Sequence, residues 1–286
     1  MLPRFCYKET YKSGGPVQDP KSGAVVIGSV LAFVLFVGAT NLKAQSDEMF
    51  DKAYPFIGNW DTEIRSPEGQ DRGNCGGRLG DYAEKLLNCS MPVDQLPLNK
   101  RGEAWLKYMD ARQSPSLAEC AHLAIPPSLG GGGFLSAYTN RIVIDTPDPS
   151  GFLITREIWM DGRKPPEAGV LFQQGYSIGH WDGDDLVVET TNFTFDPDGI
   201  DDHLHMASSV RKKVTERYHL IDENTMRLVI MVEDPTFLKK PFTYALLEAR
   251  KPGGLIPIWR ACDPDVARRE VEEGYAGNKY PEDNQK

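Results

Sequence analysis

One predicted hairpin places a single carboxylate on an otherwise apolar face. If residues 213–233 turn at Glu223, alternate side chains on the two strands share one face. The cross-strand partners would be Leu220 with Met226, Tyr218 with Leu228, Glu216 with Ile230 and Val214 with Val232. Desolvation raises the pKa of a buried carboxyl group toward the range useful for general acid–base catalysis. Glu216 is therefore a candidate catalytic residue, and the alternative is a structural ion pair with an arginine such as Arg156 or Arg163.

A second candidate cluster is the pair His203 and His205, which directly follows two aspartates. Histidines two positions apart on an extended segment point to the same side, and carboxylates could complete a metal shell. A solvated loop over residues 198–209 is one alternative, and a catalytic His205 acting with Glu216 as an acid–base pair is another. We expect no metal and no other cofactor, and a metal site at His203 and His205 is the alternative interpretation.

Five side chains are candidates for contacting a ligand at the wall or mouth of a barrel. They combine arginines, which bind anionic groups, with aromatic side chains, which pack on apolar groups and carry a polar tip. The candidates are Arg156, Arg163, Tyr176, Trp181 and Tyr218. For Arg163 the alternative is a turn with a strand-end salt bridge, because it directly follows Asp161 and Gly162.

Several common enzyme signatures are absent from the sequence. It contains no HExxH helix, P-loop or dinucleotide-binding fingerprint, which argues against the zinc proteases and nucleotide enzymes. The 286 residues include 41 acidic and 32 basic side chains, and the resulting net charge of -9 repels phosphate backbones. We therefore expect no nucleic-acid partner.

The N-terminal region has the pattern of a secretory signal. Residues 24–40 carry no charge and follow a basic segment, so we expect residues 1–44 to be a signal peptide, with a membrane anchor as the alternative. Their removal takes away five basic and two acidic residues, which leaves 27 basic against 39 acidic residues and a net charge of -12. The expected location is periplasmic or secreted, with membrane contact only if the leader is retained as an anchor.

The cysteines fit the same compartment. Removal of the leader leaves Cys75, Cys89, Cys120 and Cys262, an even set that suits disulfide formation in an oxidising environment. Three pairings are possible, and we favour Cys75 with Cys89 and Cys120 with Cys262. A zinc site is the alternative, although no CxxC spacing supports it.

The pattern of elements predicts a mainly β protein, an antiparallel calycin-like barrel or sandwich with short peripheral helices. Short runs of β-branched and aromatic residues separated by turn formers are typical of antiparallel strands. Strands are expected at 56–62, 141–146, 152–159, 185–191, 213–220, 225–233 and 242–250. Helices are expected at 81–87, at 100–111 and in a short segment after Asp263 that ends at Val271.

Three regions are expected after the leader. Residues 45–133 should supply an N-terminal strand, short helices and a wrapping arm over 114–133. Residues 134–274 should form the antiparallel β domain, and residues 275–286 a polar tail. Six or more consecutive short strands need two packed sheets or a closed barrel to hide their edges.

Residues 175–193, with the sequence GYSIGHWDGDDLVVETTNF, resemble a block found in a large family of uncharacterised secreted bacterial proteins. The resemblance implies an exported bacterial protein and brings no established activity. Where the family usually carries a His–Ser pair this chain has Ser208 and Ser209, and the family's Arg before the Trp of the block is His180 here. The segment 58–60 also resembles the entrance of lipocalin and other calycin barrels.

Three functions are compatible with these features. The first is the binding of a small, largely apolar ligand by an exported barrel. The second is a lyase, isomerase or hydrolase step on the same barrel, in which Glu216 acts with His205 or an arginine. The third is a structural module of the cell envelope. The expected partner is a small molecule.

Overall fold

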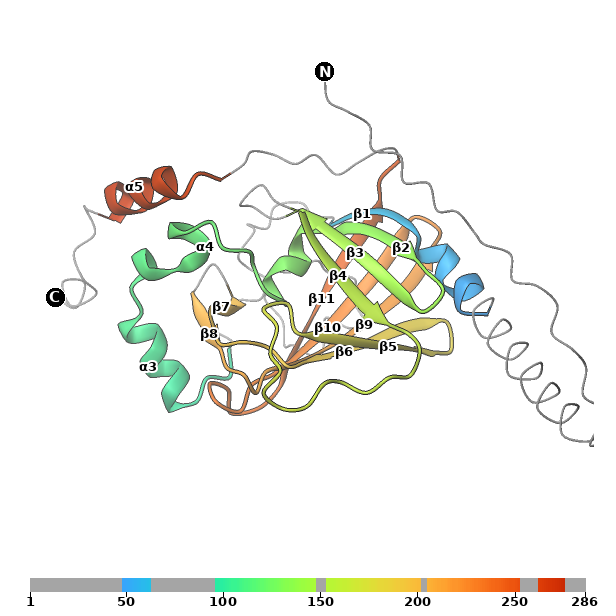
Figure 1. Cartoon of the computed structure of the whole chain (residues 1–286), viewed down its shortest axis with the longest axis horizontal. Helices are drawn as coiled ribbons and strands as arrows, with labels where there is room; N and C mark the ends of the chain where they lie inside the picture. Colours follow the sequence, from blue (N-terminus) through green and yellow to red (C-terminus); the bar gives the residue numbers. More distant parts are fainter. Residues whose placement is uncertain (1–47, 63–95, 148–152, 202–204, 253–261, 276–286) are drawn as a thin grey trace, which may run out of the picture. The chain divides into compact units, whose positions relative to one another are not determined.

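The computed structural model describes residues 48–62, 96–147, 153–201, 205–252 and 262–275 (Figure 1). Short helices and eleven strands are found there. The helical elements are η1 (Tyr54–Phe56), α3 (Lys100–Tyr108), η4 (Ala111–Gln113), α4 (Pro115–Ala118), η5 (Pro127–Gly131) and α5 (Pro264–Tyr275). The strands are β1 (Gly58–Thr62), β2 (Gly133–Ala137), β3 (Arg141–Pro147), β4 (Leu153–Trp159), β5 (Tyr176–Asp182), β6 (Asp185–Thr191), β7 (Asp196–Asp201), β8 (Met206–Ser208), β9 (Lys213–Asp222), β10 (Thr225–Glu233) and β11 (Phe242–Arg250).

Some predicted features lie outside the described residues. They are the signal peptide at 1–44, the helix at 81–87, the Cys75–Cys89 pair, His203 and the tail after Tyr275. Within the ranges that the structure describes, no helix has both the length and the apolar character needed to cross a membrane.

Nine of the strands close into a barrel, which selects the barrel over the sandwich. Their order around the barrel is β1-β2-β3-β4-β5-β6-β9-β10-β11, and β11 pairs again with β1 (Figure 1). All neighbouring strands are antiparallel except β4 and β5, which run parallel where Ile158 faces Ser177 and Trp159 faces Ile178. A parallel pair needs a crossover connection, and residues 160–175 supply it. At this one pair the structure differs from the predicted all-antiparallel sheet.

The hairpin of β9 and β10 has the predicted register. Met226 pairs with Leu220, Leu228 with Tyr218, Ile230 with Glu216 and Val232 with Val214. Buried and partly exposed residues alternate along most of both strands. The alternation fixes the register, because a slip of one residue would turn the apolar set out of the barrel.

The barrel interior is filled by side chains. Ile158, Leu186, Val188, Val214 and Ile230 are 0% exposed, and they belong to one continuous apolar cluster that also includes Trp60, Tyr218 and Leu228. Side chains without any exposed surface leave no space for water beside them. The interior around Glu216 is therefore packed, as is usual for small barrels.

The segment between β6 and β9 is a small second sheet and not a solvated loop. Strands β7 and β8 pair with each other, and Ile200, Met206 and Ala207 are buried against the apolar core. Helix α3 contacts β8, and the indole Nε1 of Trp105 donates a hydrogen bond to the backbone oxygen of His205 at 2.8 Å. The solvated-loop alternative is thus wrong for the described residues 198–201 and 205–209, because Ile200, Met206 and Ala207 are buried.

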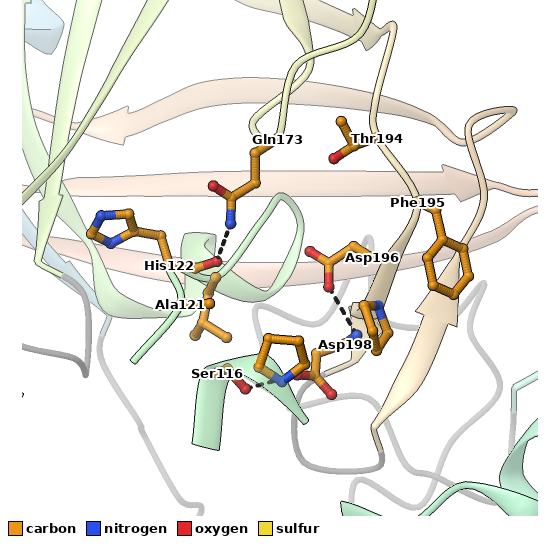
Figure 2. A pocket seen from close by; sticks show the side chains of 11 residues that line it. Ser116, Ala121, His122, Gln173, Thr194, Phe195, Asp196 and Asp198 are labelled. Atoms are coloured by element: carbon orange, nitrogen blue, oxygen red, sulfur yellow. Dashed lines mark hydrogen bonds between the residues drawn. The ribbon is translucent and has the colours of Figure 1, made fainter. Parts of the chain in front are cut away.

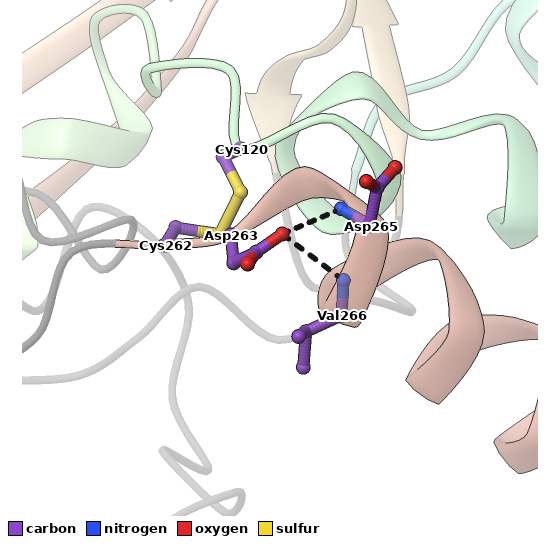
Figure 3. Close-up of a disulfide and its surroundings, with 5 residues drawn as sticks. All are labelled: Cys120, Cys262, Asp263, Asp265 and Val266. Carbon is purple, nitrogen blue, oxygen red and sulfur yellow. Dashed lines mark hydrogen bonds between the residues drawn. A yellow bond between two sulfur atoms is a disulfide. The ribbon is translucent and has the colours of Figure 1, made fainter.

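The predicted disulfide between Cys120 and Cys262 is present, with 5.8 Å between the two Cα atoms (Figure 3). It joins the segment after α4 to the residue before the cap of α5. The carboxylate of Asp263 caps this helix by accepting hydrogen bonds from the backbone N–H groups of Asp265 and Val266 (Figure 3). The helix continues to Tyr275, four residues beyond the predicted end at Val271.

Candidate functional site

Three of the predicted site residues meet inside the barrel. Arg156 on β4 donates from Nη1 and Nη2 to the two carboxylate oxygens of Glu216 on β9, at 2.8 and 2.7 Å. The hydroxyl of Tyr218 donates to the same carboxylate at 2.6 Å. Arg156 also donates to the hydroxyls of Ser177 and Thr190, at 3.0 and 2.8 Å. Because β5 and β6 lie between β4 and β9, this network crosses the inside of the barrel.

The network is saturated and closed to solvent. Glu216 is 0% exposed, Tyr218 3% and Arg156 6%. Burial by itself lowers the pKa of Arg156, but the attraction and hydrogen bonds of Glu216 outweigh it and leave this pKa raised. Burial, reinforced by the charge of Glu216, raises the pKa of Tyr218 well above its usual value. The geometry is that of a structural ion pair, which was the alternative interpretation of Glu216.

The other predicted ligand contacts lie elsewhere. Arg163 pairs with Asp161 through two hydrogen bonds of 2.8 and 2.5 Å, and its guanidinium lies 3.5 Å from the ring centre of Trp159. One nitrogen of Arg163 is 3.5 Å from the hydroxyl of Tyr176. Trp181 packs against Phe56, with 5.6 Å between the ring centres. Arg163 thus forms the strand-end salt bridge, and none of these contacts reaches Glu216.

His205 binds a different carboxylate. Its Nδ1 donates to Oδ1 of Asp198 at 3.0 Å, while Oδ2 of Asp198 accepts from the hydroxyls of Ser114 and Ser116 at 2.5 and 2.8 Å. Burial raises the pKa of Asp198, but these three hydrogen bonds together outweigh it and lower the pKa. No hydrogen bond or ion pair joins His205 to Glu216 within the described residues, so the structure does not bring the predicted acid–base pair together.

The hydroxyl groups around Asp198 do not form a catalytic triad. In a triad the histidine lies between the nucleophile and the carboxylate, whereas Ser114 and Ser116 bond to the carboxylate itself. Over the described part of the chain, no group of three or more His, Cys, Asp or Glu side chains is arranged to hold a metal ion. Asp198 also lines a hollow beside this cluster.

A hollow of about 240 Å³ opens next to the Asp198 cluster (Figure 2). Its walls come from α4 and the segment after it, from the crossover before β5, and from the start of β7. The residues that line it are Pro115, Ser116, Ala121, His122, Leu123, Gln173, Thr194, Phe195, Asp196, Pro197 and Asp198. None of them belongs to the nine barrel strands, and the five non-polar ones are two prolines, an alanine, a leucine and a phenylalanine.

Asp196 is a polar residue of the hollow that was not among the candidates from the sequence. Its Oδ1 accepts a hydrogen bond from the backbone N–H of Asp198 at 2.9 Å (Figure 2). Burial raises the pKa of Asp196, and the charge of Asp198 adds to this effect. The backbone hydrogen bond and the charge of Lys212 lower the pKa, but the balance remains a raised value. The two carboxyl groups of the hollow therefore have pKa values displaced in opposite directions.

The walls of the hollow are held by specific hydrogen bonds. The side-chain amides of Gln173 and Gln174 donate to the backbone oxygens of His122 and Leu123, both at 2.7 Å. Figure 2 shows the amide of Gln173 directed at His122 across one side of the hollow. Asn192 donates to the backbone oxygen of Val170 at 2.9 Å and so fixes the crossover. A site held in this way is largely formed before a ligand arrives.

Strained backbone positions occur in the segments that build the hollow. Among the described residues other than glycine, the positive φ angles are those of Cys120 (54°), Asn192 (58°) and His205 (55°). Cys120 precedes Ala121 in one wall, Asn192 fixes the crossover, and His205 binds Asp198. Such conformations persist where the surrounding structure enforces them, and they cluster at functional sites. This agrees with a functional role for the hollow.

Lys212 is buried and acts electrostatically on Asp196. Its ammonium donates to the backbone oxygens of Ile125 and Gly199 at 2.6 and 2.7 Å, and it lies 4.1 Å from the ring centre of Phe193. The side chain is 2% exposed. Burial lowers its pKa from 10.5 to about 7, against the opposing charges of Asp196 and Asp234.

Comparisons with protein-family models, curated proteins and solved structures return no match for this chain.

Proposed function

We propose that this protein binds a small, largely apolar molecule in the hollow beside its barrel. The observation that carries the proposal is the composition of the hollow, in which apolar walls surround one carboxyl group that still has hydrogen-bonding capacity. Within the described residues, Asp196 accepts one hydrogen bond from the protein, although a carboxylate offers about four acceptor sites. Ligand sites commonly combine apolar walls with a few placed polar groups.

The size of the hollow limits the ligand. Its volume of about 240 Å³ lies below the roughly 300–1,000 Å³ of sites for drug-sized molecules. A compound built on one ring or a short alkyl chain fits this space. A ligand inside the barrel would instead have to displace packed side chains such as Ile158 and Leu186.

We propose that the protein works outside the cytoplasm, in the periplasm or as a secreted protein. The charge-free run at 24–40 after a basic segment supports this location. The disulfide between Cys120 and Cys262 supports it as well, because disulfides persist mainly in oxidising compartments. The resemblance of residues 175–193 to secreted bacterial proteins points the same way.

A second candidate is an acid–base enzyme that uses the same hollow. Asp196 and Asp198 have pKa values displaced in opposite directions, which is the pattern of carboxyl pairs that divide acid and base roles. Compounds that bind should be incubated with the protein and recovered. Recovery of the unchanged compounds supports binding alone. Conversion of a compound by wild type that is lost in Asp196→Asn supports the enzyme.

Filling the hollow is expected to abolish ligand binding. Ala121 lies in its wall, and Ala121→Phe should occupy part of the space, so compounds found in a fragment screen by thermal shift should bind at least tenfold more weakly. The control is Ala104→Phe, which adds the same side chain at an exposed position of α3. Dissociation constants are measured by calorimetry. If the compounds bind Ala121→Phe as tightly as wild type, the hollow is not the ligand site.

A further inference from the structure

The described lining of the hollow is acidic. It contains two carboxyl groups, Asp196 and Asp198, and no lysine or arginine. The nearby Lys212 is 2% exposed and directs its ammonium to two backbone oxygens. The chain as a whole carries a net charge of -9, which repels anions and attracts cations. The two carboxyl groups would therefore repel an anionic ligand, and no lysine or arginine of the described lining would pair with it.

The two carboxyl groups are not equivalent. Asp198 accepts hydrogen bonds from Ser114, Ser116 and His205, so its bonding capacity is largely used within the protein. Asp196 accepts one hydrogen bond, from the backbone N–H of Asp198, among the residues that the structure describes. A ligand that donates hydrogen bonds therefore finds its acceptor at Asp196.

The remaining lining suits an apolar body attached to the donor group. Pro115, Leu123 and Phe195 present aliphatic and aromatic surface to the hollow, and Phe195 is 49% exposed. Its ring is held by the ring of Trp105, which meets it edge-on at 5.8 Å between centres. A ligand that covered Phe195 would remove apolar area from water, which stabilises the complex by roughly 25 cal/mol for each Å².

We infer that the ligand class of this hollow is small hydrophobic amines, whose ammonium group pairs with Asp196 while the apolar body packs against Phe195 and its neighbours. This inference rests on the proposed function. It adds the charge of the ligand and the residue that recognises it. Hydrogen bonds between an ammonium and a carboxylate are roughly twice as strong as neutral ones, so the carboxylate of Asp196 is the source of selectivity.

The test compares ligands of the same shape that differ in charge. Binding of benzylamine, benzyl alcohol and benzoate to the full mature chain is measured at pH 7.5 by calorimetry and by NMR. We expect benzylamine to bind at least tenfold more tightly than benzyl alcohol and benzoate to bind least. Backbone amide signals of Thr194 and Phe195 should shift when benzylamine is added.

Two variants assign the selectivity to one residue. Asp196→Asn should weaken benzylamine binding at least tenfold and leave benzyl alcohol binding unchanged, whereas Asp196→Glu should retain the preference for the amine. The matched control is Asp184→Asn, which makes the same change of net charge at an exposed turn between β5 and β6. Its affinity for benzylamine should equal that of wild type.

The results separate the inference from the proposed function. If neutral or acidic compounds bind in the hollow and benzylamine has no advantage in wild type, the amine inference is overturned and small-molecule binding stands. The same holds if Asp196→Asn and Asp184→Asn weaken benzylamine equally. If no fragment binds wild type in a way that Ala121→Phe removes, the proposed function fails and the inference fails with it.

Discussion

Removing one partner of the Arg156–Glu216 pair is expected to lower the free energy of unfolding by about 3–5 kcal/mol. The substitutions are Arg156→Met and Glu216→Leu, each of which leaves the other charge buried without its partner. The pair is 6% and 0% exposed, so water cannot replace the lost contact. Urea unfolding followed by circular dichroism measures the loss.

Replacing the whole network should cost much less than either single change. The triple variant Arg156→Met/Glu216→Leu/Tyr218→Phe removes both charges and the hydroxyl that bonds to Glu216, while Ser177 and Thr190 still bond to each other at 2.9 Å. Buried ion pairs replaced by apolar residues of similar volume are often neutral in stability. We expect the free energy of unfolding of the triple variant to lie within about 2 kcal/mol of the wild-type value.

An exposed pair on the same barrel supplies the control. Lys213 and Glu189 are 2.9 Å apart, with side chains 35% and 51% exposed, and Lys213→Met or Glu189→Leu should each change stability by about 1 kcal/mol or less. Effects at Arg156 and Glu216 that were equally small, or that simply added in the triple variant, would contradict a buried pair acting as one unit.

The sequence pattern was sufficient to predict that Glu216 lies on the apolar face of the hairpin, but it did not decide which arginine pairs with it. Alternation along residues 213–233 fixes the face and the register of the hairpin, because both are local properties of two strands joined by a short turn. The choice between Arg156 and Arg163 depends on how β4 sits relative to β9. Two strands separate them in the barrel, so only closure of the sheet decides which arginine reaches the carboxylate.

The hollow could not be predicted for a related reason. Its walls combine residues near 115–123, 173 and 194–198, and no local pattern links these segments. Asp196-Pro197-Asp198-Gly199 consists of residues that favour turns, yet it enters strand β7 because Ile200 and Met206 are buried in the core. Tertiary burial overrides local propensity here, and it also turns His205 toward Asp198. Strand β5 was missed because Gly179 interrupts its alternating pattern, and β2 because it begins at the end of the glycine run 130–133.

Lys212 is expected to make stability depend on pH above neutrality. Its pKa is about 7 in the folded protein, against 10.5 without burial. Between these values the unfolded chain holds a proton on this lysine that the folded protein lacks, so the contribution of Lys212 becomes less destabilising as pH rises. One pKa unit corresponds to about 1.4 kcal/mol. The folded lysine is half protonated at pH 7, so the free energy of unfolding should rise by about 2 kcal/mol from pH 7 to pH 9 through Lys212 alone.

The variant Lys212→Met isolates this contribution. At pH 6 the substitution removes the burial of a charge and should raise stability relative to wild type, offset by the loss of hydrogen bonds to Ile125 and Gly199. At pH 9 the wild-type lysine is largely neutral when folded and much of this cost is relieved, so the advantage of the variant over wild type should be smaller. The free energy of unfolding of the variant, taken relative to that of wild type, should thus fall by about 2 kcal/mol between pH 7 and pH 9.

The range above pH 7 separates the titration of Lys212 from that of Glu248, a second buried group whose pKa is about 7. Burial raises the pKa of Glu248 from 4.5 to about 7, so its stabilising contribution is complete below pH 4.5 and is lost as pH rises through 7. Unfolding is therefore compared at pH 7, 8 and 9 for wild type, Lys212→Met and Lys213→Met, the last being the neighbouring lysine on β9 with 35% side-chain exposure. If the stability curves of wild type and Lys212→Met against pH are parallel, Lys212 keeps its proton in the folded protein. If these two curves converge with rising pH while Lys213→Met stays parallel to wild type, Lys212 loses it.

Loss of the charge on Lys212 would also leave the hollow more negative, since Lys212 acts electrostatically on Asp196. Benzylamine should then bind more tightly at pH 8 than at pH 6, whereas benzyl alcohol should bind equally at both.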